Sequence, residues 1–118
     1  MSSDWKHIDL AYLHTMIGED QETKKAILDL IISELPTEVE FIQQAADKED
    51  WFSISKACHK LISTLSFVGN RQLEQWINEL HNMSKNPDHS GGIPQVLVNI
   101  QQMVPLVLAE MEEIRSTL

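Results

Sequence analysis

The residues best suited to chemistry in this sequence surround His59, in a stretch without carboxylates. Positions 51–73 contain no Asp or Glu but contain Lys56, Lys60 and Arg71, whereas the whole chain of 118 residues has a formal net charge of −9. A neutral imidazole is a nucleophile near neutral pH. Neighbouring cations favour a group that becomes anionic when it reacts. The pattern therefore suits a histidine that accepts a phosphoryl group, with Lys56 and Lys60 near enough in sequence to stabilise it.

The spacing around His59 provides both room and a contact surface. On a helix, Ser55 and Ser63 lie one turn before and one turn after His59. The apolar stripe of the same segment centres about 120° away, so we expect the imidazole at the solvent boundary. The two small serines leave space for a phosphoryl group and its donor. Phe52 and Ile62 flank the site and offer an apolar contact to a docking partner.

Plainer interpretations of these residues remain open. His59 can be an ordinary surface histidine on an amphipathic helix, and the positive stretch can be chance in a mostly buried helix. Cys58 falls in the apolar stripe, and adjacent helix residues do not face each other, so no Cys58–His59 catalytic pair is expected. The remaining histidines lack the spacing of a helical metal site, and we expect them on the surface without a metal. They are His7, His14, His81 and His89.

Apolar spacing of three and four residues predicts the helices that must position His59. They run from about Asp9 to Ile17, from Asp20 to Lys48, from after Asp50 to Gly69, from Asn70 to Met83, and from Ile93 onwards. Pro36 should kink the second helix rather than divide it, Pro105 should kink the last, and Ser84–Gly92 is the only long loop. We predict an all-α fold, an antiparallel up-down four-helix bundle with a short extra N-terminal helix, as a single domain of residues 1–118.

Composition limits the possible partners and the compartment. The net charge of −9 disfavours binding to nucleic acid or to an anionic membrane. Cys58 is the only cysteine, so no disulfide framework is possible. The first residues have no basic region followed by an apolar stretch, as a signal peptide would. We therefore expect a cytoplasmic protein, and a bundle that is stable as a monomer.

Several motifs in the sequence, taken together, resemble the histidine-containing phosphotransfer (HPt) domain family. The central motif is Ala57-Cys58-His59-Lys60-Leu61 followed by Phe67-Val68-Gly69. In that family an apolar residue follows the histidine by two positions and a glycine follows it by ten, and Leu61 and Gly69 match both. The resemblance covers roughly residues 8–83. Its upstream elements are Asp9-Leu10, Leu13, Met16-Ile17-Gly18-Glu19-Asp20, Leu35-Pro36 and Asp50-Trp51.

The resemblance implies a four-helix bundle whose His59 is phosphorylated, on Nε2, by a phospho-aspartyl receiver domain. The group would then pass to a second receiver or back, as in two-component signal transduction. Such domains have no kinase activity and no cofactor of their own, while the partner receiver uses Mg²⁺. The partners implied are response-regulator receivers and a hybrid sensor kinase.

Two positions depart from the family pattern and keep other functions open. The family has lysine three residues and glycine four residues after the histidine, where this chain has Ile62 and Ser63. Lys60 or Lys56 can substitute for that lysine, and serine is a small replacement for glycine. The alternative is a non-catalytic helical adaptor that binds a receiver without phosphotransfer. An unrelated bundle that binds a metal or small ligand would need inward-facing polar residues, which the apolar stripes almost entirely lack.

Overall fold

The computed structural model describes residues 5–118, except for the side chains of Pro87, His89 and Ser90, and these residues form helices and no strand. The elements are α1 (Ala11–Ile17), α2 (Gln21–Asp47), α3 (Trp51–Leu65), α4 (Arg71–Lys85), the 3-10 helix η2 (Pro87–Gly92) and α5 (Ile93–Thr117). The all-α fold class predicted from the sequence is confirmed.

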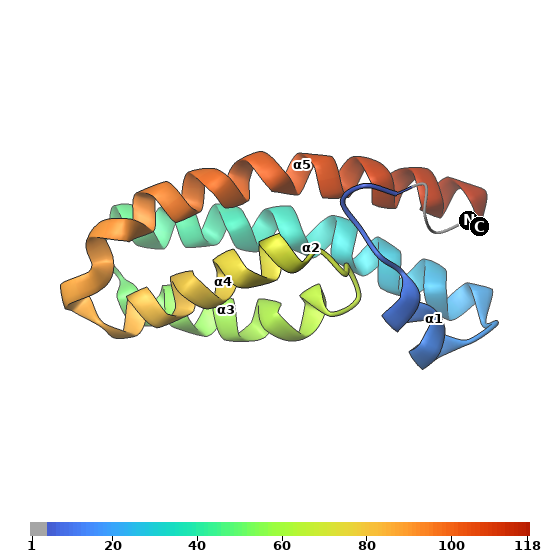
Figure 1. The fold of residues 1–118 in the computed structure, drawn as a ribbon, viewed down its shortest axis with the longest axis horizontal. Helices are drawn as coiled ribbons and strands as arrows, with labels where there is room; N and C mark the ends of the chain where they lie inside the picture. The colour runs from blue at the N-terminus through green and yellow to red at the C-terminus, as the bar shows by residue number, and fades with distance from the viewer. Residues whose placement is uncertain (1–4) are drawn as a thin grey trace.

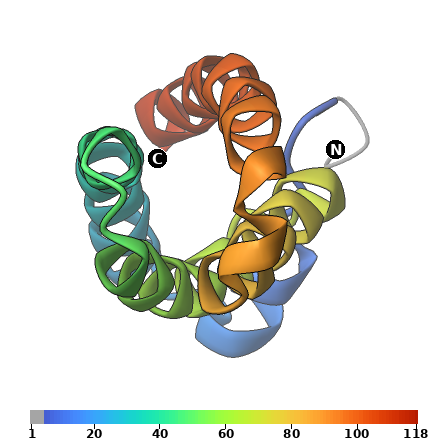
Figure 2. The same ribbon diagram turned by 90° about the vertical axis from the view of Figure 1, so that its left-hand side faces the viewer.

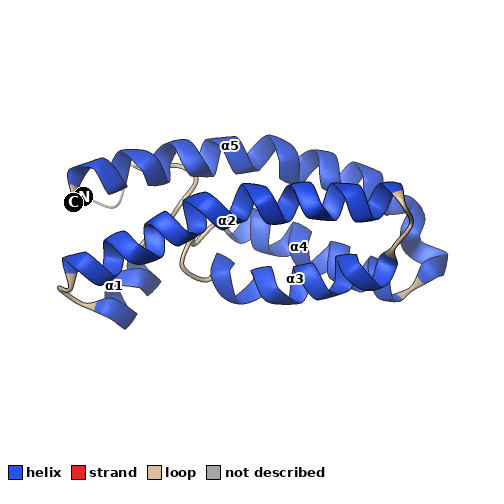
Figure 3. Ribbon diagram, turned by 180° about the vertical axis from the view of Figure 1, so that it is seen from behind, coloured by secondary structure: helices blue, strands red, loops and turns tan. Residues whose placement is uncertain are grey.

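The four long helices, α2 to α5, form an antiparallel up-down bundle (Figure 1). Viewed end-on, they follow one another in chain order around a common axis, and α5 closes the ring against α2 (Figure 2). The molecule measures 46 × 22 × 20 Å along its principal axes. α2 and α5 extend beyond the α3–α4 hairpin, and α1 lies beside the first turns of α2 (Figure 3).

The core lies along the bundle axis because each long helix turns one apolar stripe inward. The stripe of α3 consists of Ile54, Ala57, Cys58, Leu61 and Leu65, all buried. These residues fix the rotation of α3, so that residues on its opposite side, His59 among them, face solvent. No helix in residues 5–118 is long and apolar enough to span a membrane.

Polar side chains cap the N-termini of α2, α3 and α4, close to where the sequence predicts these helices to start. The carboxylate of Asp50 accepts hydrogen bonds from the backbone N–H (3.2 Å) and the hydroxyl (2.7 Å) of Ser53. These bonds, the hydroxyl bond foremost, lower the pKa of Asp50. Asn70 accepts the backbone N–H of Leu73 at 2.8 Å, and Asp20 caps α2 in the same way. Such caps satisfy N–H groups that have no partner within the helix.

The helix boundaries differ from prediction mainly at α1 and at the end of α3, which stops at Leu65 rather than at Gly69. α1 begins two residues late, because Asp9 accepts the N–H of Ala11 at 2.9 Å from outside the helix. α2 runs through Pro36 as one helix, as predicted, and α5 likewise continues through Pro105. Both prolines are exposed. A carbonyl left without a partner on an exposed helix face can turn to water, so neither proline ends its helix.

The predicted loop between residues 84 and 92 is largely helical, so that prediction is wrong. α4 continues through Ser84 to Lys85, and η2 then connects it to α5. The side chain of Ser84 is buried, and its hydroxyl donates to the carbonyl of His81 at 2.7 Å. This bond within the last turn satisfies a polar group that would otherwise be buried without a partner.

The N-terminal segment, residues 5–10, crosses the turn between α3 and α4 and is hydrogen-bonded to it. The N–H of Asp9 donates to the carbonyl of Val68 at 2.9 Å, and the amide of Asn70 donates to the carbonyl of His7 at 2.8 Å. Between them, Gly69 has a φ of +72°, and a Cβ there would lie 2.2 Å from the carbonyl oxygen of Asp9. Only glycine permits both this backbone conformation and this close approach.

Candidate functional site

His59 lies in the middle of α3 with its side chain exposed, as the sequence predicts. Ser55, one turn earlier, is half-buried, and Ser63, one turn later, is exposed. Phe52 is 73% exposed on the same side of α3, and Ile62 is half-buried. The structure therefore brings these predicted residues onto one accessible face of α3.

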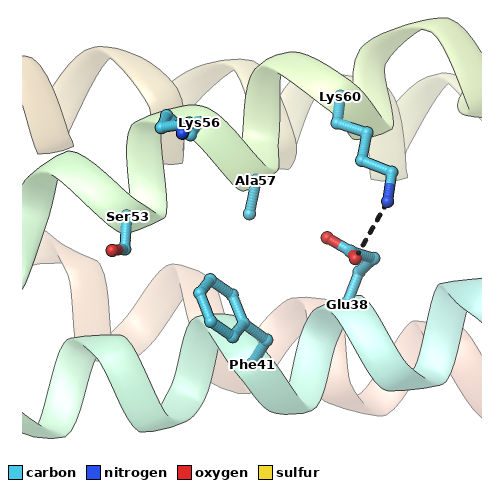
Figure 4. Close-up of a pocket in the computed structure, with 6 residues that line it drawn as sticks. All are labelled: Glu38, Phe41, Ser53, Lys56, Ala57 and Lys60. Atoms are coloured by element: carbon cyan, nitrogen blue, oxygen red, sulfur yellow. Dashed lines mark hydrogen bonds and ion pairs between the residues drawn. The ribbon is translucent and has the colours of Figure 1, made fainter.

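The two predicted lysines lie on a different side of α3, toward α2. A groove between α2 and α3 is lined by Glu38, Phe41, Ser53, Lys56, Ala57 and Lys60 (Figure 4). The groove residues that belong to α3 recur at helical spacing, and their mean direction lies about 110° around the helix axis from that of His59. Lys56 and Lys60 thus lie beside the face that carries His59 rather than within it.

Each lysine has its own partner. The ammonium group of Lys60 lies 3.3 Å from a carboxylate oxygen of Glu38 on α2, across the groove (Figure 4). The ammonium group of Lys56 lies 5.5 Å from the ring centroid of Phe52, a cation–π distance. The sequence stretch is free of carboxylates, but the folded site is not, because α2 brings Glu38 to it.

His81, which we predicted to be a surface residue, is half-buried and lies next to His59, a contact that we did not predict. Its ring centroid lies 6.2 Å from that of His59, with 33° between the ring planes. Burial lowers the pKa of His81, and the positive charges of Lys85 and His59 lower it further. One signal was present in the sequence: His59 and His81 stand eleven residues before and eleven after Asn70, where the chain reverses.

The remaining histidines fall into three cases. His14 is exposed, as predicted, and the side chain of His89 lies outside the described residues. His7 is half-buried, and its Nδ1 lies 2.7 Å from a carboxylate oxygen of Glu110 on α5. Burial acts to raise the pKa of Glu110, but hydrogen bonds from the backbone and ring of His7 and from the backbone of Lys6 outweigh it, and this pKa is lowered.

Neither thiol chemistry nor metal chemistry is favoured at this face. Cys58 is fully buried, and burial raises the pKa of its thiol to about 12. Such a thiol stays protonated and is a poor nucleophile near neutral pH. Across the part of the chain that the structure describes, no group of three or more His, Cys, Asp or Glu side chains is placed to hold a metal ion.

An up-down four-helix bundle is the architecture that the HPt resemblance implied. No protein-family model matches the sequence, and no curated protein matches it significantly. Among solved structures, the chain is similar to the crystal structure of histidine-containing phosphotransfer protein B from Pseudomonas aeruginosa PAO1, with a TM-score of 0.85. The two chains are 14% identical, and the match covers 95% of this chain and 96% of that chain. The chain therefore has the HPt fold.

Proposed function

We propose that this protein is a phosphorelay carrier that accepts a phosphoryl group on His59 and passes it to another protein. The observation that carries the proposal is the exposed imidazole of His59 in the middle of α3, between Ser55 and Ser63, on a bundle with the HPt fold. The name of the similar structure describes phosphotransfer by a histidine, and the face described above has what that reaction needs. An accessible ring with small neighbours can be approached in line by a donor on another protein.

The chemistry proposed is a single exchange at phosphorus. The lone pair of Nε2 of His59 forms the P–N bond while the acyl P–O bond of an aspartyl phosphate breaks, and the electron pair leaves with the aspartate carboxylate. The proton on Nδ1 stays in place. The chain supplies no kinase activity and needs no cofactor of its own in this scheme, since Mg²⁺ stays with the donor receiver.

The surface around His59 suits the docking of a receiver domain. Phe52, with 73% of its surface exposed, and Ile62 provide the apolar contact. Lys56 and Lys60 border this contact and favour the approach of a partner whose active site carries carboxylates and a phosphoryl group. We propose response-regulator receivers and a hybrid sensor kinase as partners, with the protein acting as a cytoplasmic monomer.

Phosphoryl uptake tests the proposal directly. The intact protein is incubated with phosphoramidate, or with a phosphorylated receiver, and followed by mass spectrometry and ³¹P NMR. We expect one acid-labile, base-stable adduct in the wild type and in His14→Gln, the exposed-histidine control, and none in His59→Gln. The free energy of unfolding of His59→Gln should lie within about 0.5 kcal/mol of the wild-type value, because the side chain is exposed. An adduct that persists in the folded His59→Gln protein would refute the assignment.

A second candidate function is a receiver-binding adaptor without phosphotransfer. Two observations favour it: Ile62 and Ser63 occupy the usual lysine and glycine positions, and Lys60 is paired with Glu38. Titration calorimetry with receivers, combined with the uptake assay, distinguishes the two functions. Binding with no adduct, in a protein shown to be folded, would support the adaptor and count against the carrier.

A further inference from the structure

One aromatic neighbour of His59, the imidazole of His81, comes from α4 and not from α3. The ring of His81 stands 6.2 Å from the ring of His59, centroid to centroid. His81 is half-buried, and the hydroxyl of Ser84 is bonded to its backbone carbonyl in the last turn of α4. Packing between α3 and α4 therefore fixes the position of this imidazole at the edge of the His59 face.

Lys85 lies one helical turn beyond His81, and residues four apart lie on the same helix face. Its ammonium group is close enough to contribute to the lowered pKa of His81, after burial and together with His59. Lys85 of α4 and His59 of α3 are the charged or titratable groups that act on His81. Among the described side chains, none from η2 or α5, which also pack against α4, contributes to that pKa.

The two lysines of α3 are engaged elsewhere. Lys60 is paired with Glu38, and Lys56 lies over the ring of Phe52. Neither of these contacts points an ammonium group at the ring of His59. A phosphoryl group on His59 adds about two negative charges at the edge of the His81 ring. The side chains in place to offset that charge are thus His81, beside the ring of His59, and Lys85, which acts on His81 from the same helix, rather than the lysines of α3.

We propose that His81, assisted by Lys85, is the phosphoryl-binding group of this carrier and takes up one proton when His59 is phosphorylated. The inference rests on the proposed function and names residues to which that function assigned no role. A charge-assisted hydrogen bond spans about 2.8 Å, so the His81 ring lies within reach of oxygens extending from the neighbouring ring. The P–N bond forms and the acyl P–O bond breaks as before. The proton that converts His81 to its imidazolium form comes from solvent.

The size of the effect follows from the separation of the two rings. Two negative charges and one positive charge about 6 Å apart in water interact strongly enough to change an equilibrium about tenfold at low ionic strength. Added salt reduces the effect. The contribution of His81, taken as the difference in phosphoryl retention between the wild type and a variant without this imidazole, should consequently shrink as pH rises and His81 loses its proton, because the neutral ring no longer offsets the charge.

The first test uses the wild-type chain, so it does not depend on whether a variant folds. The ring C–H signals of His81 and His14 are followed by NMR as a function of pH, before and after phosphorylation with phosphoramidate. We expect the midpoint of His81 to move to higher pH on phosphorylation and that of exposed His14 to stay unchanged. A His81 midpoint that does not move, or that moves to lower pH, would overturn the inference.

The second test separates a charge effect from a structural one. At low ionic strength and a pH below the His81 midpoint, His81→Gln should retain the phosphoryl group about tenfold less well than the wild type, and this difference should shrink as pH rises. His81→Arg should retain it at least as well as the wild type throughout, because arginine stays charged. His14→Gln is the matched control and should behave as wild type. Equal retention in wild type and His81→Gln, with an adduct present in both, overturns this inference alone. Absence of any adduct in the wild type overturns the proposed function as well.

Discussion

Replacing Gly69 by alanine tests whether the N-terminal segment holds the α3–α4 hairpin that carries the site. Gly69 and Gly18 both have a positive φ, +72° and +69°, but Gly18 has a ψ of −132° and so lies outside the left-handed helical region. They also differ in their surroundings, because an added Cβ at Gly18 meets nothing within 4 Å, whereas at Gly69 it lies 2.2 Å from the carbonyl oxygen of Asp9. Gly18→Ala therefore tests a Cβ at positive φ in open space, and Gly69→Ala adds the clash with Asp9.

A positive φ by itself costs a non-glycine residue about 1 kcal/mol or more, and lower entropy of the unfolded chain offsets about 0.5 kcal/mol. In Gly69→Ala, the backbone of Asp9 must also retreat by about 1 Å to reach an ordinary contact. That movement breaks its 2.9 Å bond to Val68 and disturbs the bond from Asn70 to His7. At about 1 kcal/mol for each bond, Gly69→Ala should be at least about 2 kcal/mol less stable than the wild type.

Urea denaturation followed by circular dichroism measures both variants under the same conditions. We expect the slope of the wild type and a lower midpoint for Gly69→Ala, together with a melting temperature about 8 °C below that of the wild type. A Gly69→Ala variant within about 0.5 kcal/mol of the wild type would refute the reasoning, because the close approach of Asp9 would then have no energetic consequence.

Two further predictions concern Glu110 and the lysines of α3. The folded pKa of Glu110 is lowered, so its bonds to the N-terminal segment stabilise the protein above the unfolded carboxyl pKa, about pH 4.3, and are lost as pH falls through the folded value. Glu110→Gln should therefore cost about 1 kcal/mol at pH 7, and this difference from wild type should shrink in urea titrations at more acidic pH. Replacing Lys56 and Lys60 together by alanine should slow transfer from a phosphorylated receiver several-fold without loss of folding. Glu38→Gln, which frees Lys60, should not slow it, and unchanged kinetics in the double variant would show that neither lysine takes part.

The helices were predictable because their apolar residues recur every three to four positions, which places them on one face of a helix that is then buried. The stripe of α3 shows the reason: Ile54, Cys58, Leu61 and Leu65 are all buried as the sequence predicts. The segment 84–92 was not predictable in the same way. Its composition, rich in Asn, Pro, Asp, Ser and Gly, indicates a loop, and a 3-10 helix as short as η2 has no apolar repeat to reveal it.

The site was predictable only where it depends on a single helix. The exposure of His59 and the positions of Ser55 and Ser63 follow from rotation about α3, which its own apolar stripe determines. The pairing of Lys60 with Glu38 joins residues 22 positions apart on two helices, and no local pattern contains it. The lysines were therefore correctly placed near the site, but their partners were not foreseen.

The pairing of His59 with His81 shows how such a contact arises between helices. Antiparallel helices joined by a short turn bring together residues at equal distances from that turn, provided that both face the same side. Asn70 begins α4 and is bonded to the N-terminal segment, so the register of the hairpin is fixed near its turn. With the register fixed there, two histidines eleven residues either side of Asn70 meet at the edge of the bundle. A variant that loosens the turn, such as Gly69→Ala, should then weaken phosphoryl retention at His59 as well as stability, although residue 69 lies well outside the site.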